Sequence, residues 1–166
     1  ETAAYWRSKD TTYYAYPNQR LNILRRYSLK AFSDRWMVQA EACDYYNDLT
    51  PGNQGGAFRA GDIDICKTSD AFGGWNVFDA EPGEWMEWKE LPIPEKGLFE
   101  IRYAAEQEAQ IQFVVGNQEG EILTLEPTGD DQSWALAKDT SFNILENSHH
   151  NVKLKVVSGN VSINYF

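Results

Sequence analysis

The fold is decided by residues 70–88, which read Asp-Ala-Phe-Gly-Gly-Trp-Asn-Val-Phe-Asp-Ala-Glu-Pro-Gly-Glu-Trp-Met-Glu-Trp. The Gly-Gly and Pro-Gly pairs predict turns on either side of a short strand, and a second strand follows. In this second strand Met86 and Trp88 point to one face, while Trp85 and Glu87 point to the other, because successive side chains alternate across a strand. The first face predicts core. The second fits either a binding platform or a cap on the edge of the core, and the pattern favours neither.

The same alternation continues along the chain from Trp36. Candidate strands recur about every ten residues, with Gly, Pro and Asn turns between them and no convincing helix. They cover residues 37–42, 62–65, 99–103, 110–115, 122–126, 152–157 and 161–166, and a long loop spans residues 44–57. In the first of these segments Gln39 and Glu41 share a face. This spacing predicts an all-β sandwich or barrel.

Chain length, net charge and hydrophobicity limit the classes of protein to which this chain can belong. A chain of 166 residues is long enough for one domain with an appendage. The net charge of −10 argues against nucleic acid as a partner, because phosphate binding requires a basic surface. The longest apolar run is too short to span a membrane. Nothing at the N-terminus resembles a signal peptide, so we expect the chain either to be intracellular or to be part of a longer protein.

The charge is unevenly distributed between the two parts of the chain. Residues 1–35 hold seven Lys and Arg against three Asp and Glu, and residues 36–166 hold eight against twenty-two. The break near Ser33 predicts a boundary between an N-terminal segment, 1–35, and a β-domain, 36–166. The first segment is either the tail of a preceding domain or an arm that lies on the acidic body.

Two cysteines are too few for a disulfide framework. Cys43 and Cys66 either form a single bridge or are buried free thiols, and the separation of their Cα atoms decides between the two.

The candidate for a catalytic strand is the segment Asp62-Ile63-Asp64-Ile65, because its alternation puts two carboxylates on one strand face. The pattern is similar to the acidic strand of retaining β-glucanases, whose catalytic carboxyl groups lie about 5 Å apart. The third carboxylate of such a strand would fall at position 66, which is Cys. We therefore expect no enzymatic activity.

Metal binding by histidine is not expected either. His149 and His150 are adjacent, so on a strand they point to opposite faces and cannot hold one ion together. Gln39, Glu41 and Asn164 offer the oxygen ligands that a hard cation takes.

Several short motifs together resemble the family 6 carbohydrate-binding modules, in the subtype with a long first loop. They occur in the family's order across residues 36–166, and residues 1–35 lie outside the resemblance. The motifs are Val38–Glu41, Thr50–Arg59, Asp62–Ile65, Gly73–Val77, Gly83–Trp88, Ile101–Ala105, Trp134 and Ser162–Phe166.

This resemblance implies a jelly-roll β-sandwich of two antiparallel sheets that binds polysaccharide without cleaving it. It also implies a covalently linked glycoside hydrolase, an extracellular location and a structural calcium ion. By resemblance the calcium ligands are Gln39, Glu41, Asn164 and the backbone carbonyl of Trp75. We further expect a monomer, with neither nucleic acid nor a membrane as partner.

The family has a sugar site among the loops at one end of the sandwich, and this chain departs from it. Trp134 matches one of the two aromatic residues that clamp the sugar. The second aromatic position is Asp79, with Phe78 beside it; the Asn position is Ser162, with Asn160 two residues earlier; and the Glu position is Cys66. The resemblance therefore implies a loop site that is either lost or rebuilt, the latter with Trp75, Phe78 or Tyr45.

The second family site lies on the concave face of one sheet, where Trp85 matches the platform tryptophan. An indole ring packs against the C–H face of a sugar, and the carboxylate of Glu87 accepts hydrogen bonds from hydroxyl groups. Gln110, Gln112 and Arg102 are expected on the same face. We therefore favour this site over the loop site.

The sequence thus predicts a module that targets a glycoside hydrolase to a neutral β-glucan, agarose or xylan. The alternative is a degenerate structural domain that packs on a neighbouring catalytic domain and binds no sugar, because fold does not imply function.

Overall fold

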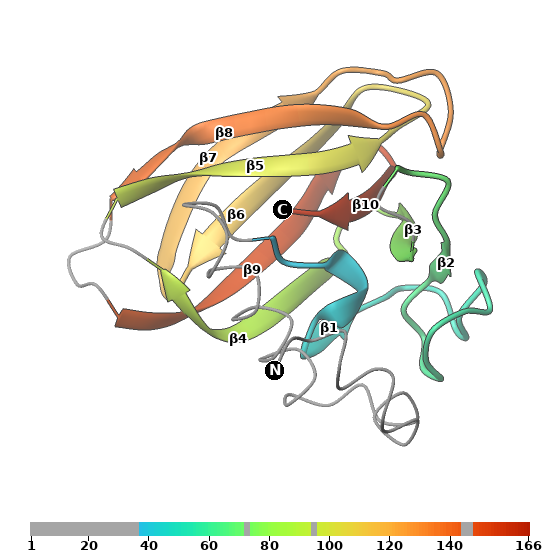
Figure 1. Cartoon of the computed structure of the whole chain (residues 1–166), viewed down its shortest axis with the longest axis horizontal. Helices are drawn as coiled ribbons and strands as arrows, with labels where there is room; N and C mark the ends of the chain where they lie inside the picture. Colours follow the sequence, from blue (N-terminus) through green and yellow to red (C-terminus); the bar gives the residue numbers. More distant parts are fainter. Residues whose placement is uncertain (1–36, 72–73, 94–95, 144–147) are drawn as a thin grey trace.

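The computed structural model describes residues 37–71, 74–93, 96–143 and 148–166, so the predictions for residues 1–35 lie outside the described part. Two five-stranded antiparallel sheets pack face to face, as Figure 1 shows, which confirms the predicted all-β sandwich. No helix among these residues is long and apolar enough to cross a membrane.

The first sheet has the strand order β1-β4-β9-β6-β7. Its strands are β1 (Tyr45–Asn47), β4 (Trp85–Ile93), β9 (Ser148–Ser158), β6 (Ala109–Val115) and β7 (Gln118–Leu125). The second sheet has the order β2-β3-β10-β5-β8. Its strands are β2 (Ile65–Lys67), β3 (Trp75–Ala80), β10 (Val161–Tyr165), β5 (Lys96–Ala104) and β8 (Ala135–Asn143).

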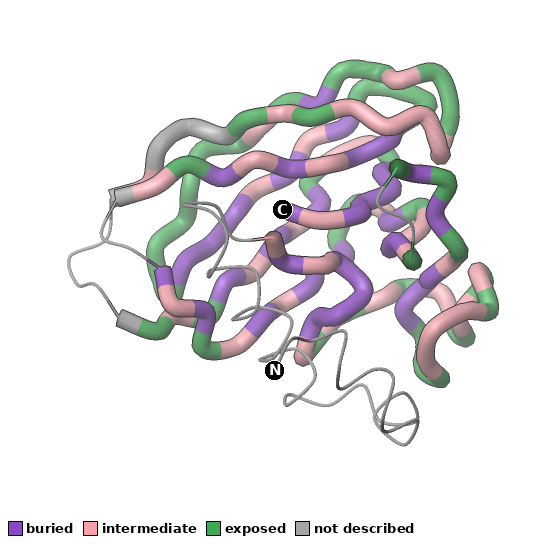
Figure 2. Tube along the Cα trace, in the orientation of Figure 1, coloured by how far each residue is buried: buried purple, intermediate pink, exposed green. Residues whose placement is uncertain are grey.

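The core lies between the sheets and follows the predicted alternation. Met86 and Trp88 of β4 are buried, whereas Trp85 and Glu87 remain partly exposed, and Figure 2 shows the same alternation along the other long strands. Phe99 of one sheet stacks on Phe113 of the other with ring centroids 4.3 Å apart. Burying a side chain of this size contributes about 1.5–3 kcal/mol, so these inward rows hold the two sheets together.

Two predicted strands are shorter than expected. Residues 37–42 form only an isolated bridge from Gln39 to Tyr165, followed by the 3₁₀ turn η1 (Ala40–Ala42). The segment 62–65 becomes a strand only at Ile65, because the carboxylates of Asp62 and Asp64 accept backbone N–H bonds from the long loop. The two carboxylates therefore order a loop and do not share a strand face.

Two strands were absent from the sequence prediction. β1 lies within the segment predicted as a loop, and β8 lies in a polar stretch that alternates weakly. Both are edge strands, because each has only one neighbouring strand among the residues that the structure describes. An edge position demands less apolar patterning than a central one, which explains why the sequence pattern was weak.

Both cysteines are free thiols, so the bridge considered for Cys43 and Cys66 is not formed. The Arg59 guanidinium donates to the backbone oxygen of Cys43 at 2.9 Å and to its Sγ atom at 2.8 Å. Burial nevertheless raises the pKa of the Cys43 thiol to about 11, so it stays protonated at neutral pH. This contact attaches the long loop to the core.

Candidate functional site

The end of the second sheet brings Trp134 into line with three polar residues that the sequence singled out. β8, β5, β10 and β3 are neighbours in that order. Ala135 pairs with Tyr103, so Trp134 lies next in register to Ala104, and Ala104 in turn pairs with Ser162. Three strand spacings separate β8 from β3, a distance of about 14 Å. We call Trp134, Ser162, Asp79 and Asn160 together the Trp134 row.

Asp79, Asn160 and Ser162 meet at the β3 end of this row. Asn160 Nδ2 donates to Asp79 Oδ1 at 3.1 Å, and the backbone N–H of Asp79 donates to Ser162 Oγ at 3.2 Å. Asp79 adopts φ +51°, a conformation that Asp tolerates better than most residues. Ser162 is buried, whereas Asp79 and Asn160 are exposed. Asp79 can therefore offer a carboxylate oxygen, and Asn160 an amide group, to sugar hydroxyls.

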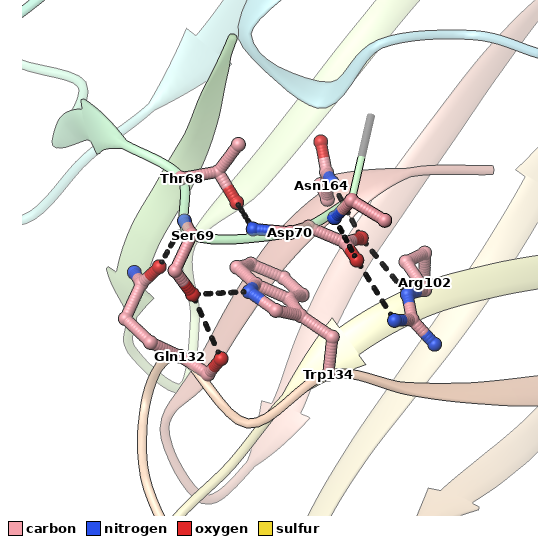
Figure 3. A network of polar contacts seen from close by, with 8 residues as sticks. Thr68, Ser69, Asp70, Arg102, Gln132, Trp134 and Asn164 are labelled. Carbon is pink, nitrogen blue, oxygen red and sulfur yellow. Dashed lines mark hydrogen bonds and ion pairs between the residues drawn. The ribbon is translucent and has the colours of Figure 1, made fainter. Parts of the chain in front are cut away.

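Trp134 is half-buried, and one edge of its indole ring is fixed. Its Nε1 atom is 3.3 Å from Ser69 Oγ, as Figure 3 shows. Ser69 is itself held by Gln132, because its hydroxyl donates to the Gln132 backbone oxygen at 3.1 Å and its N–H to Gln132 Oε1 at 2.9 Å. Among the described residues, no cation lies over the Trp134 ring.

A buried ion pair lies next to Ser69 and anchors this loop to the sheet (Figure 3). The Asp70 side chain is only 3% exposed and accepts two bonds from Arg102, from Nε at 2.9 Å and from Nη2 at 2.8 Å. Asn164 Nδ2 donates to the same carboxylate at 2.8 Å. The Arg102 guanidinium, with the help of Asn164, lowers the pKa of Asp70 to about 2, so the pair stays ionised.

The aromatic residues considered for rebuilding the loop site lie in different places. Trp75 packs against Phe58, with ring centroids 5.1 Å apart, and against the core. Tyr45 belongs to β1 of the other sheet. Phe78 is half-buried beside Asp79 on β3. Trp75 and Phe78 both lie on β3, the strand that carries Asp79, but only Phe78 is next to Asp79 in the chain.

The second predicted platform, Trp85, lies on the outward face of β4 together with Glu87, as the alternation predicted. Gln110 and Gln112 belong to β6 of the same sheet. The expectation for Arg102 was wrong, because β5 belongs to the other sheet and the Arg102 side chain pairs with Asp70.

The Trp85 ring is covered by a neighbouring side chain. Lys153 Nζ on β9 lies 4.0 Å from the centroid of the Trp85 ring and 3.1 Å from a carboxylate oxygen of Glu87. The platform that the sequence favoured is therefore occupied by an ammonium group.

The residues expected to hold calcium meet at one corner of the second sheet. Glu41 is a buried carboxylate in η1, which packs on β3 and β10, and Asn164 is buried on β10. The amide nitrogens of Gln39 and Asn164 donate to Met37 Sδ and Asp70, which leaves their oxygens as possible ligands. This donor set fits a hard cation. The described His, Cys, Asp and Glu residues alone form no group of three that could hold a metal ion.

Sequence reasoning missed four residues that shape these sites: Ser69, Asp70, Gln132 and Lys153. The first three are polar loop residues, which are common in any sequence, and Lys153 is an ordinary outward residue of a strand. Their importance comes from partners that are distant in the chain, so no local pattern marks them.

A β-sandwich that carries partly exposed tryptophans beside amides and carboxylates has the features of a carbohydrate-binding module. Comparison with known proteins supports this class. The family model described as "Carbohydrate binding module (family 35)" matches residues 59–166, which is more than half of the chain. The chain therefore belongs to this family and, as a carbohydrate-binding module, it is non-catalytic. Residues 1–45 match a model described as a domain of unknown function, DUF5010.

Solved structures of family 6 modules share the fold. The C-terminal module of the marine laminarinase LamC from Zobellia galactanivorans is 22% identical, with a TM-score of 0.61 over 78% of this chain and 94% of that one. A module from Cellvibrio mixtus lichenase 5A, in complex with cellotriose, is 23% identical, with a TM-score of 0.62 over 78% and 92%. A β-1,3-glucan-binding module from Bacillus halodurans is 19% identical, with a TM-score of 0.62 over 78% and 91%. No curated protein matches the chain.

Proposed function

We propose that this module binds a neutral polysaccharide of the β-glucan, agarose or xylan type through the Trp134 row. The observation that carries the proposal is the backbone register that places the position of Trp134 in one row with Ser162, beside Asp79 and Asn160, across the four neighbouring strands β8, β5, β10 and β3. An indole supplies apolar contact area for the C–H face of a sugar ring. The carboxylate and amide at the other end of the row can bind its hydroxyl groups.

The nature of the ligand is supported by charge. The module carries a large excess of acidic over basic residues, and Asp79 is exposed within the row itself. Sulfated or otherwise anionic chains would be repelled by this surface, whereas neutral chains meet no such penalty. Similar modules whose structures are known bind cellotriose and β-1,3-glucan, both of which are neutral.

We further propose that the module belongs to a secreted glycoside hydrolase and acts as a monomeric domain that keeps the linked enzyme on its substrate. Two of the similar modules come from a laminarinase and a lichenase, which supports this context. Calcium bound by Gln39, Glu41, Asn164 and the Trp75 carbonyl would fasten η1 to β3 and β10, and Asn164 would connect this corner to Asp70 in the loop that holds Trp134.

The test is affinity electrophoresis of the chain in gels that contain laminarin, agarose, xylan or alginate. We expect at least one neutral polysaccharide to retard the wild type, and Trp134→Ala to abolish the retardation. Trp85→Ala is the matched control, because it removes the same ring from the other sheet. Retardation by alginate alone, or retardation that Trp134→Ala leaves intact, would refute the proposal.

A second candidate function is the structural domain that binds no sugar. It is favoured by the occupied Trp85 platform and by the changed residues at positions 66, 79 and 162 of the loop site. Failure of all four polysaccharides to retard the folded wild type would make this the better assignment.

A further inference from the structure

The outward face of the first sheet holds the rings of Trp85 and Tyr45, and the ammonium group of a lysine lies close to each of them. Lys153 Nζ lies 4.0 Å from the centroid of the Trp85 ring. Lys89 Nζ lies 4.1 Å from the centroid of the Tyr45 ring and also contacts the Tyr45 hydroxyl. Among the described residues, Trp134 has no such cation above it, so the two candidate sugar surfaces differ in this respect.

The pairing of strands β4 and β9 keeps Lys153 in this position. Glu87 is the direct cross-strand partner of Lys153, and Trp85 lies two residues away on the same face of β4. Lys153 Nζ is 3.1 Å from Glu87 Oε2, and Asn151 Nδ2 donates to Glu87 Oε1 at 2.9 Å. The ammonium group is therefore held by a carboxylate whose own position is fixed by a third residue.

This geometry leaves little room for a sugar on the covered side of the ring. Atoms in van der Waals contact lie about 3.5–4.0 Å apart, so the ammonium occupies the layer in which the first atoms of a stacked sugar would lie. Trp85 has a second cross-strand neighbour, Asn47, on strand β1. A neutral sugar would have to displace Lys153, and with it both the cation–π contact and the Glu87 ion pair.

We propose that Lys153 is a specificity-determining residue, which excludes uncharged sugars from the Trp85 face and confines polysaccharide binding to the Trp134 row. This inference rests on the proposed function, because exclusion from one face matters only for a module that binds sugar. The Trp85 face and the Trp134 row each carry a partly exposed tryptophan, but the proposal gives sugar binding to the Trp134 row alone.

The experiment replaces Lys153 in a background without the working site. In neutral-polysaccharide gels, Trp134→Ala alone should not be retarded. Addition of Lys153→Met, which keeps most of the aliphatic stem but removes the charge, should restore retardation, with a gain in affinity of about tenfold. A further Trp85→Ala change should remove this gain. Lys138→Ala is the matched control, because Lys138 forms a similar ion pair with Glu100 at 3.0 Å on the other sheet.

Circular dichroism and a melting curve establish that each variant is folded, and Lys153→Ala gives a second test if the methionine variant is not. Loss of wild-type binding in Trp85→Ala, or no Trp85-dependent gain on removal of Lys153, would overturn the inference. If the wild type binds through Trp134 and the Lys153 variants gain nothing, the proposed function stands and this inference alone fails. If the wild type binds nothing and the Lys153 variants gain Trp85-dependent binding, Lys153 does block the Trp85 face, but the proposed function and the confinement to the Trp134 row both fail.

Discussion

The two tryptophan surfaces of this module differ in what surrounds the ring. Trp134 is fixed at its Nε1 edge by Ser69, in a loop that a buried ion pair anchors to the sheet. Trp85 lies among charged residues, and an ammonium group lies over its face. A sugar needs the face of an indole and not its edge. The comparison therefore teaches that exposure of a tryptophan is a poorer guide to a sugar site than the side chains that lie above its ring.

The buried ion pair provides the sharpest test of this difference. Asp70→Asn leaves Arg102 without its carboxylate, and we expect the free energy of unfolding to fall by about 3 kcal/mol. Glu100→Gln is the control on the same strand, because the Lys138–Glu100 pair is more exposed and its loss should cost below about 1 kcal/mol. Urea denaturation measures both. Equal losses would show that the Asp70 pair has no special role beneath the Trp134 row.

A bound calcium ion should also affect the Trp134 loop. The expected ligand Asn164 also donates to Asp70, so the metal corner and the Trp134 loop share a residue. At a calcium concentration one hundred times the dissociation constant, we expect a bound ion to stabilise the fold by about 2.7 kcal/mol. Chelator should therefore lower the melting temperature of the wild type by several degrees and leave Glu41→Gln unchanged. An identical wild-type melting curve in chelator would rule out the metal assignment.

Acid should weaken the same ion pair. The Arg102 guanidinium lowers the folded-state pKa of Asp70 to about 2, below the value of about 3.9 for an unfolded Asp. The resulting stability, about 2 kcal/mol, is present above pH 4 and is lost as the pH falls from 4 to 2. Burial raises the pKa of Asp64 and Glu84, which act in the opposite sense. The difference between wild type and Asp70→Asn across this range isolates the Asp70 contribution, and a constant difference would contradict it.

The smallest effect is expected at the hydroxyl that fixes Trp134. Ser69→Ala removes the bond from Trp134 Nε1 and should weaken polysaccharide binding by about fivefold, which corresponds to about 1 kcal/mol. Ser69→Thr keeps the hydroxyl and should restore affinity. Glu87→Gln changes the Trp85 face only, and calorimetric titration should find no change in neutral-polysaccharide affinity for it. A greater loss in Glu87→Gln than in Ser69→Ala would reverse the roles of the two faces.

The sequence predicted the sandwich well because alternation is a local property. The strand that contains Met86 and Trp88 was identified with its inward and outward faces, and six other strands, β3, β5, β6, β7, β9 and β10, were found near their observed positions. Prediction was weaker where burial on one face is not required. The edge strands β1 and β8 were missed, and residues 37–42 form a bridge and a 3₁₀ turn where a strand was expected.

The residues of the candidate sites likewise fall into those that the sequence identified and those that it did not. Trp85, Glu87, Asp79 and Trp134 could be named from sequence, because their types and their places in the strand pattern were sufficient. The roles of Lys153, Ser69 and Asp70 could not, since each depends on a partner at least 30 residues away in the chain.

By itself, therefore, the sequence determined the class of fold and which face of each strand points outward, because the side-chain period of a strand is two wherever the strand lies. The net charge of −10 also argues against nucleic acid as a partner. Only the tertiary structure decided which side chains lie beside each of the two tryptophans. Strand pairing brings Lys153 over Trp85 and Ser69 to the edge of Trp134, and such pairings are set by the whole sandwich and not by any one segment.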